Sequence, residues 1–368
     1  MTSMKREERD WLYLLSVVPG LGRKRIRAIY EWYGSFSEAL EDWASVEQLW
    51  KLSPMVSKHV RDYIKEETGQ KLVEKRDKAD FRYICFLDEA FPDKLRHMPD
   101  NPLTLFAKGE LELLHQPAIG VVGSRRPTPY GRACCTHLVK ELSQHGLVIV
   151  SGLAHGIDGE AHRAALQVKG KTIGVLGCGI DQVYPAGHRA LYREIETFGL
   201  IVSEYPPGTL PLPGFFPERN RIISGLSLGI LVVEGAERSG SLVTADCALE
   251  QGRDVFAVPG PIFSLVSAGP HNLIKQGAKL VTSSMDVLEE WNHLLPVHDR
   301  NVEAAAEVLD LDEREIAVLS ALSYEGVHVD ELSKQLSPDI QVSMHRSLLQ
   351  LETKGRIVSL PGGYFAKR

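Results

Sequence analysis

A repeated strand–loop–helix pattern between residues 117 and 260 sets Gly, Ser and Arg side chains where a ligand can be bound. In its clearest instance an apolar run ends in Gly-Ser-Arg-Arg at 123–126, and two prolines then start a helix. The glycine lets the backbone approach a ligand, and a guanidinium can hold a phosphate through two parallel bonds. Because a helix N-terminus also attracts anions, the loop predicts phosphate binding. The predicted contacts are Gly123, Ser124, Arg125 and Arg126.

The next strand end repeats this chemistry at 151–158, which reads Ser-Gly-Leu-Ala-His-Gly-Ile-Asp. A Ser-Gly pair again separates an apolar run from a helix, and we expect Asp158 to act as the N-cap of that helix. The predicted contacts are Ser151, Gly152 and Gly156.

Two later segments add cations and hydroxyl groups. At 216–225 two arginines flank an asparagine at the expected start of a helix, where cations oppose the helix dipole unless an anion is bound. We interpret that inconsistency as a functional site. At 234–244 serines and a threonine can line a helix N-terminus with donors. The predicted contacts are Arg219, Asn220, Arg221, Ser239, Gly240, Ser241 and Thr244.

Short apolar strands rich in Val, Ile and Leu alternate with helical stretches and position these loops. The pattern predicts strands at 118–123, 147–151, 172–177, 200–204, 229–234 and 254–258. Continuously apolar strands separated by helices indicate a parallel sheet covered on both faces. The predicted fold class is therefore α/β, a Rossmann-like doubly wound parallel sheet, whose ligands bind beyond the carboxyl ends of the strands.

Two smaller domains flank this sheet. In the N-terminal one, a Val-Pro-Gly-Leu-Gly turn at 18–22 joins two apolar helices and resembles a helix-hairpin-helix unit. Either a phosphate-binding hairpin or a helical packing module fits that pattern. From residue 311, three amphipathic helices and a Gly-turned hairpin are typical of a winged helix. The predicted domains are a helical domain at 1–80, an extended Rossmann-like domain at 81–291 that opens with a strand at 81–86, a linker at 292–310, and a winged-helix domain at 311–368.

The composition is that of a soluble protein with more than one core. A chain of 368 residues with 43% hydrophobic content can form two or three domains. No apolar run reaches the roughly 18 residues of a membrane helix, and the charged N-terminus differs from a signal peptide. We expect a cytoplasmic protein without membrane association. The five cysteines form no CxxC pair, so we expect buried, reduced thiols and no metal site.

The charge distribution restricts how nucleic acid can be bound. A net charge of −6 argues against a histone-like, non-specific DNA-binding protein but allows a local basic patch. Residues 301–368 carry eleven acidic and seven basic side chains, a net charge of −4. We therefore predict that the winged helix serves mainly in protein contact rather than in DNA binding.

Several enzyme signatures are missing from the sequence. No Walker lysine follows the Gly-rich loops, and no acidic residue follows a complete dinucleotide fingerprint. There is no carboxylate or metal-ligand cluster suited to a nuclease. The sequence therefore predicts no catalytic residues and no cofactor.

Five motifs occur in order along the chain: GSRRPTPYG at 123–131, SGLAHGID at 151–158, SEYPPG at 203–208, FPERNRIISGLS at 216–227 and SGSLVTA at 239–245. Together they resemble the DNA-processing protein A (DprA/Smf) family. The resemblance implies a non-enzymatic, cytosolic homodimer that binds single-stranded DNA during natural transformation and loads the RecA recombinase. It also implies dimer and recombinase contacts at the far end of the Rossmann-like domain. These contacts are His271, Leu273, Ile274 and Leu280.

Two other functions stay open at this point. A phosphoribohydrolase of the lysine-decarboxylase-like (LOG) group has a similar sheet, but its PGGxGTxxE pattern is incomplete here, since 234–241 lacks the Gly-Thr pair and the following Glu. A pure interaction scaffold with vestigial anion sites is the third possibility. Release of free base from nucleoside monophosphates would indicate the hydrolase, and failure to bind an oligonucleotide would indicate the scaffold.

Overall fold

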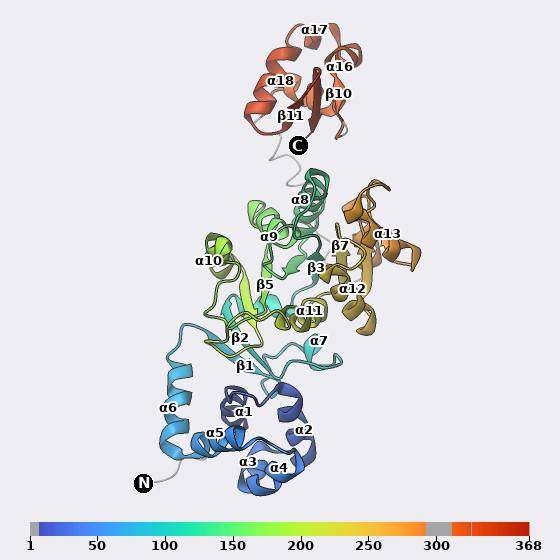
Figure 1. Cartoon of the computed structure of the whole chain (residues 1–368). Helices are drawn as coiled ribbons and strands as arrows, with labels where there is room; N and C mark the ends of the chain where they lie inside the picture. The colour runs from blue at the N-terminus through green and yellow to red at the C-terminus, as the bar shows by residue number, and fades with distance from the viewer. Residues whose placement is uncertain (1–6, 292–310, 325, 368) are drawn as a thin grey trace. The chain divides into compact units, whose positions relative to one another are not determined.

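The computed structural model describes residues 7–291, 311–324 and 326–367. The chain divides into two units, Met1–Leu295 and Pro296–Arg368, each with a core of its own (Figure 1). The predicted linker at 292–310 lies outside the described residues.

Six helices form the N-terminal part of the first unit. Their apolar faces, including Leu12, Ile29 and Phe36, pack into one cluster that extends to the sheet at Phe106. Glu8 accepts hydrogen bonds from the backbone N–H groups of Phe36 and Ser37 at 2.6 and 3.0 Å and so joins the first helix to the third. The helices are α1 (Glu8–Ser16), α2 (Arg23–Tyr33), α3 (Phe36–Glu41), α4 (Trp43–Leu49), α5 (Pro54–Ile64) and α6 (Glu66–Asp77).

A single sheet of nine strands follows within the described residues, in the order β1-β2-β6-β5-β4-β3-β7-β8-β9. Strands β3 to β9 run parallel, as predicted, whereas β1 and β2 add an antiparallel edge. The strands are β1 (Arg82–Cys85), β2 (Thr104–Gly109), β3 (Ala118–Val122), β4 (Val148–Ser151), β5 (Thr172–Leu176), β6 (Leu200–Ser203), β7 (Gly229–Val232), β8 (Asp254–Ala257) and β9 (Lys279–Leu280).

The two edges depart from the predicted sheet. Strand β2 is absent from the predicted strands and inserts between β1 and β6, in register with β6 from Phe106 opposite Ser203 to Gly109 opposite Leu200. Strand β9 has only two residues and is too short to give a periodic signal. Both strands are held by pairing with strands distant in sequence, which local patterns do not encode.

Helices cover both faces of the sheet, which explains why the central strands are apolar on both sides (Figure 1). Helices α8 and α9 pack side by side on one face with α10 beyond them, and α11 and α12 pack together on the other. Short 3-10 turns occupy Leu111–His115, Ala186–His188, Leu265–Ser267 and Glu289–Trp291. The helices are α7 (Asp93–Arg96), α8 (Pro129–Gln144), α9 (Ile157–Gln167), α10 (Arg189–Phe198), α11 (Phe215–Leu226), α12 (Gly240–Glu250), α13 (Ala268–Lys275) and α14 (Ser284–Leu288).

The second unit is a winged helix built on its own apolar cluster, which includes Val318, Leu348 and Ile357. The predicted helices and hairpin are present, and the structure adds the short α17 and the strand β10. Its elements are α15 (Glu313–Ala321), β10 (Val327–His328), α16 (Val329–Gln335), α17 (Pro338–Gln341), α18 (Met344–Thr353), β11 (Ile357–Leu360) and β12 (Tyr364–Lys367).

The five thiols are all free, but only three are buried. Cys134 and Cys247 are partly exposed, so the prediction of five buried cysteines is wrong for these two. Burial raises the pKa of the Cys178 thiol to about 11, which keeps it protonated at neutral pH.

Candidate nucleic-acid interface

The predicted loops meet where the chain direction across the sheet reverses. From β3 the chain proceeds through β4 and β5 to β6 on one side, whereas β7, β8 and β9 lie on the other. In open α/β sheets this switch point is where ligands bind, beyond the carboxyl ends of the strands. The loops after β3, β4 and β7 all open onto it, and they carry most of the predicted contacts.

Hydrogen bonds join the loop after β3 to the loop after β7. Glu234 is buried and accepts from the Thr128 backbone N–H at 2.9 Å and from the Thr128 hydroxyl at 2.6 Å. Thr128 in turn caps α8 by accepting from the Gly131 N–H at 3.1 Å. Glu234 is not among the residues predicted from the sequence, although one acidic residue at the end of a buried apolar strand is a recognisable signal.

The loop after β4 packs directly on the loop after β3. The backbone N–H of Ile157 donates to the Ser124 carbonyl at 3.1 Å. Gly156 has a φ of +81°, and a Cβ there would lie 2.2 Å from the Ser124 carbonyl oxygen. Only glycine therefore allows the two loops to approach this closely.

Asp158 does not cap α9 as predicted. The N-cap is Gly156, and the Asp158 carboxylate turns back to accept from the Gly152 N–H at 3.1 Å. Burial raises the pKa of Asp158 in spite of the nearby Arg219 guanidinium. The carboxylate therefore shapes the loop 152–156 rather than satisfying the start of the helix.

Arg219 and Arg221 are buried, with 4% and 7% exposure, and neither stands at a helix start. Helix α11 begins at Phe215, one turn earlier than predicted, so the prediction that these cations oppose the dipole at the helix start is wrong. Arg219 donates to the carbonyl groups of Gly152, at 2.7 Å, and Val175. Arg221 pairs with Glu204 at 2.5 Å and approaches Asp100 at 3.5 Å.

Arg219 is connected to the start of α12 through Asn220, which lies nearer the surface. Its Nε donates to the Asn220 side-chain oxygen at 3.3 Å, and the Asn220 amide donates to the Gly240 carbonyl at 3.3 Å. The ends of β4 and β5 are thereby connected to the first turn of α12. The structure thus brings Arg219, Asn220 and Gly240 together, but Arg219 is buried and supports the other two rather than facing a ligand.

The start of α12 offers donors, and its first turn has no acidic residue. Ser239 is its N-cap, but the Ser239 hydroxyl bonds the Ser241 hydroxyl at 2.6 Å rather than the helix backbone. No acidic residue occupies the first turn of this 11-residue helix. Its first N–H groups are therefore not capped by the Ser239 side chain, which favours an anion.

Exposure divides the predicted contacts into two groups. Arg125 and Arg126 are exposed, and neither has an acidic partner in the part of the chain that the structure describes. Ser151 and Thr244 are fully buried, and Ser151 donates to the Val121 carbonyl at 2.6 Å. At or near the surface lie Gly123, Ser124, Arg125, Arg126, Gly156, Asn220, Ser239 and Gly240. Buried are Ser151, Gly152, Arg219, Arg221, Ser241 and Thr244.

The residues expected at a dimer or recombinase contact lie on α13 and β9. Leu273 is 5% exposed and belongs to the sheet core, so its assignment to an interface is wrong. Leu280 is 44% exposed on the last strand of the sheet. His271 is partly exposed, its Nε2 lies 3.0 Å from the Gly260 carbonyl, and Ile274 is also partly exposed.

Two family models match the chain. The first, described as DNA recombination-mediator protein A, matches residues 82–292, and the second, the DprA winged helix domain, matches residues 302–363. Among curated proteins, Protein Smf of Escherichia coli is 45% identical over 284 residues, which is 76% of each chain. The DNA processing protein DprA of Streptococcus pneumoniae is 49% identical over 211 residues, covering 57% of this chain and 74% of that protein.

Solved structures agree with these matches. The crystal structure of DprA from Streptococcus pneumoniae has a TM-score of 0.69 and 40% identity, covering 80% of this chain and all of that chain. DprA from Helicobacter pylori, whose structure concerns its single-stranded DNA binding mode, has a TM-score of 0.53 and 30% identity and covers 60% of this chain and all of that chain. The chain belongs to the DNA-processing protein A (DprA/Smf) family.

Proposed function

We propose that this protein binds single-stranded DNA along the switch point of the sheet. The proposal rests on Arg125 and Arg126, which are exposed and have no acidic partner among the described residues. Both lie on the loop after β3, which is hydrogen-bonded to the loop that leads into α12, and no side chain caps the start of that helix. Unpaired guanidinium groups beside helix N–H donors suit a chain of phosphates. The binding mode named for the Helicobacter pylori relative supports this choice of ligand.

The predicted residues divide into direct contacts and supports. The residues with access to phosphate are Gly123, Ser124, Arg125, Arg126, Asn220, Ser239, Gly240 and, through its backbone, Ser241. Ser151, Gly152, Gly156, Arg219, Arg221 and Thr244 hold the loops in place from below. This division follows burial, because a buried and paired guanidinium cannot reach a strand without leaving its partners.

The phosphates supply most of the affinity, so sequence preference along these loops is low. Bases are held by stacking rather than by base-edge hydrogen bonds. Duplex binds more weakly because loops spaced for one bent backbone leave no room for a second strand. Affinity decreases with salt at a slope of about −0.7 for each phosphate neutralised.

Catalysis is not part of the proposed function. Glu234 and Asp158, the two carboxylates that hold the loops after β3, β4 and β7 in place, are buried and committed to backbone and hydroxyl donors. Neither is free to act as a general base on a nucleotide. Incubation of the pure protein with nucleoside monophosphates should release no free base, and release would instead support the LOG-like hydrolase.

We extend the proposal to recombination in the cytoplasm. The protein acts as a homodimer that protects incoming strands during natural transformation and loads the RecA recombinase on them. The exposed edge formed by β9 and α13, with His271, Ile274 and Leu280, is the proposed contact surface. No helix among the described residues is both long and apolar enough to cross a bilayer.

Fluorescence anisotropy with a labelled 20-nucleotide strand and the matching duplex tests the central proposal. The single strand should bind more tightly than the duplex, and added salt should weaken both. Equal binding of the two forms, or no binding at low salt, would contradict it.

A further inference from the structure

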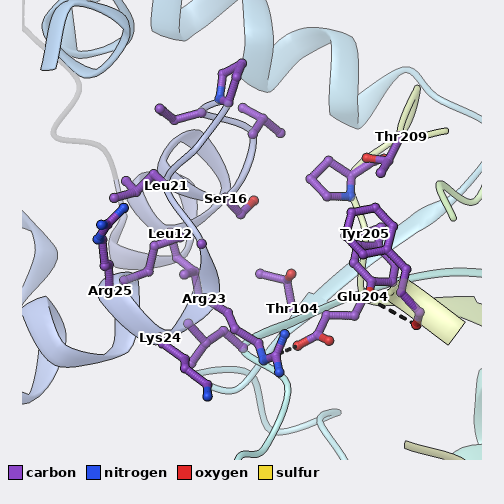
Figure 2. A pocket seen from close by; sticks show the side chains of 18 of the residues that line it. Leu12, Ser16, Leu21, Arg23, Lys24, Arg25, Thr104, Glu204, Tyr205 and Thr209 are labelled. Carbon is purple, nitrogen blue, oxygen red and sulfur yellow. Dashed lines mark hydrogen bonds and ion pairs between the residues drawn. The ribbon is translucent and has the colours of Figure 1, made fainter. Parts of the chain in front are cut away.

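A cavity of about 860 Å³ between the N-terminal hairpin and the loop after β6 contains charges that neutralise one another (Figure 2). The Glu204 carboxylate lies 3.9 Å from the Arg23 guanidinium and 2.5 Å from that of Arg221. Arg23 also pairs with Asp100 and Glu218, each at 2.8 Å. These pairs leave the buried carboxylate no role in binding a ligand. A surface better suited to a ligand lies on the loop after β8.

The loop after β8, residues 258–267, places three large apolar side chains almost fully in water. Ile262 is 79% exposed, Phe263 is 94% exposed and Leu265 is 85% exposed. No charged residue occurs between positions 255 and 270. Single apolar side chains scattered over a surface are normal, but three on one short loop indicate a contact surface.

Hydrogen bonds fix the backbone of this loop. The Ser264 N–H donates to the Pro261 carbonyl, and the Ser267 N–H donates to the Ser264 carbonyl, both at 3.0 Å. Near its start, the Gly260 carbonyl lies 3.0 Å from Nε2 of His271. The apolar side chains are therefore presented by an ordered backbone, which lowers the entropic cost of binding.

The same loop is joined to both segments that carry the proposed phosphate contacts. Tyr130 lies in the first turn of α8, directly after the loop of Arg125 and Arg126, and its hydroxyl donates to the Pro259 carbonyl at 2.8 Å. The N–H of Gly235, in the loop that leads to α12, donates to the Val266 carbonyl at 2.7 Å.

The strand order places the loop within reach of the same ligand. Strands β3, β7 and β8 are neighbours in the sheet, so the ends of β3 and β8 are about 10 Å apart. This distance corresponds to about three nucleotides at the rise of about 3.4 Å in a stacked strand. A strand held at Arg125 and Arg126 can therefore extend to the loop after β8.

Single-stranded DNA combines the two kinds of surface that these loops complement. Its phosphates are anionic, and its unpaired bases have flat faces that stack on aromatic rings. The loop after β3 supplies cations, whereas the uncharged loop after β8, with Phe263 as its most exposed side chain, suits the bases. Proteins that bind single strands without sequence preference combine a cationic groove with aromatic rings in this way.

We propose that bases of the bound strand stack on Phe263, flanked by Ile262 and Leu265, while the phosphates follow the loops after β3 and β7. The inference rests on the proposed function and adds to it the place of the bases. The strand then runs across the carboxyl ends of β3, β7 and β8. All four bases have a face that can stack, so the contact adds affinity without sequence preference.

Fluorescence anisotropy of the full chain with a labelled 20-nucleotide strand tests the proposal. Phe263→Leu keeps an apolar side chain but removes the ring, and it should weaken single-strand binding about tenfold. Phe263→Trp should bind at least as tightly as the wild type. The salt slope should not change in Phe263→Leu, because no phosphate contact is lost. Equal affinity of Phe263→Leu and the wild type would overturn the proposal.

Phe198→Leu is the matched control variant. Phe198 is 60% exposed, but it ends α10, which precedes β6, so it lies toward the opposite edge of the sheet. This variant should bind the strand as the wild type does. A 20-unit abasic strand, which has phosphates but no bases, is the matched ligand. It should bind the wild type and Phe263→Leu equally, and a difference between them would contradict base stacking.

The outcomes distinguish this inference from the proposed function. If the wild type does not bind the strand, both fail, whereas normal binding in Phe263→Leu removes the inference alone. The loop also lies beside α13 of the proposed self-contact. Sedimentation velocity of the Ile262→Ser/Phe263→Ser double variant should therefore show an unchanged mass. A lower mass would assign the loop to contact with a second copy and overturn the proposal.

Discussion

Arg125 and Arg219 show how burial changes the use of one residue type. Arg125 is exposed and has no acidic partner in the described ranges, so its charge is available to a ligand. Arg219 is 4% exposed and donates to main-chain carbonyl groups at the ends of two strands. Both belong to the shared motifs, but only the first can meet a phosphate without rearrangement.

Replacing Arg125 by Ala should weaken single-strand binding about tenfold, uniformly across sequences, because a phosphate contact carries no base information. The salt slope measured by anisotropy should also become shallower by about 0.7. Arg193→Ala, an exposed arginine on α10, is the matched control and should bind as the wild type does. Unchanged affinity in Arg125→Ala would argue against the proposed interface.

His162 should make the folded protein sensitive to acid. It is fully buried, and its Nδ1 lies 2.6 Å from the Thr172 hydroxyl, which itself donates to the Ile149 carbonyl. The imidazole therefore carries its proton on Nδ1. Burial, with smaller contributions from His188 and Arg219, lowers the pKa of His162 from 6.5 to about 3.

Between pH 6.5 and 3 the unfolded chain binds a proton at this residue that the folded chain does not. The free energy of unfolding should therefore fall with decreasing pH, by up to about 1.4 kcal/mol per pH unit from this group. Urea titrations at several pH values on wild type and His162→Gln measure the effect. The variant should show a shallower dependence, and identical slopes would mean that His162 titrates normally.

At the scale of elements, the interface depends on loops that touch rather than on any one helix. Gly156 has a φ of +81° and a ψ of −130°, a backbone conformation that residues other than glycine rarely adopt. It is also the point at which the loop after β4 meets Ser124. The close approach of the loops that precede α8 and α9 therefore depends on Gly156, which has no side chain.

Substituting Gly156 by Ala should lower the free energy of unfolding by about 2 kcal/mol or more and weaken strand binding, because the added methyl group displaces the Ser124 carbonyl. Gly187→Ala is the control, since a Cβ there meets no atom within 4 Å. Chemical denaturation and anisotropy report the two effects. Normal stability in Gly156→Ala would show that the loops can separate without loss.

The winged helix is predicted to contribute little to strand affinity. Its segment is net negative, and its elements form a core separate from the sheet. A chain ending at residue 291 should retain single-strand affinity within about tenfold of the full chain at equal salt. A larger loss in the anisotropy titration would assign a DNA-binding role to this domain.

At the scale of the whole molecule, the last strand of the sheet is the proposed self-contact. Strand β9 pairs with β8 alone among the described strands, and Leu280 lies 44% exposed on it. An exposed apolar residue on a free strand edge is suited to association. His271 and Ile274 lie on the preceding helix, whereas Leu273 points into the core.

Leu280→Arg should therefore convert the proposed dimer to a monomer, because each copy would place a charge at a symmetric contact. Sedimentation velocity measures the change in mass. Lys275→Ala, a polar change on α13, should leave the dimer intact. A dimeric Leu280→Arg protein, or a monomeric wild type, would refute this contact surface.

The order of elements and the position of the candidate site are largely encoded locally. Apolar runs predict six parallel strands within a residue or two of their observed ends, since buried strands need continuous Val, Ile and Leu. The loops after β3, β4 and β7 follow from Gly and Ser at those ends, and the ordered motifs identify the family. These features depend on neighbouring residues, so the sequence alone determines them.

Tertiary packing decides which side chains face a ligand. The sequence pattern predicts that Arg219 and Arg221 are ligand-binding cations at a helix start. In the structure α11 begins at Phe215, and both side chains point toward buried acceptors. The same holds for β2, which depends on pairing with the distant β6, and for Glu204, whose partners Arg23 and Arg221 come from distant parts of the chain. Burial and charge pairing are sums over residues far apart in sequence, and only the folded chain brings those residues together.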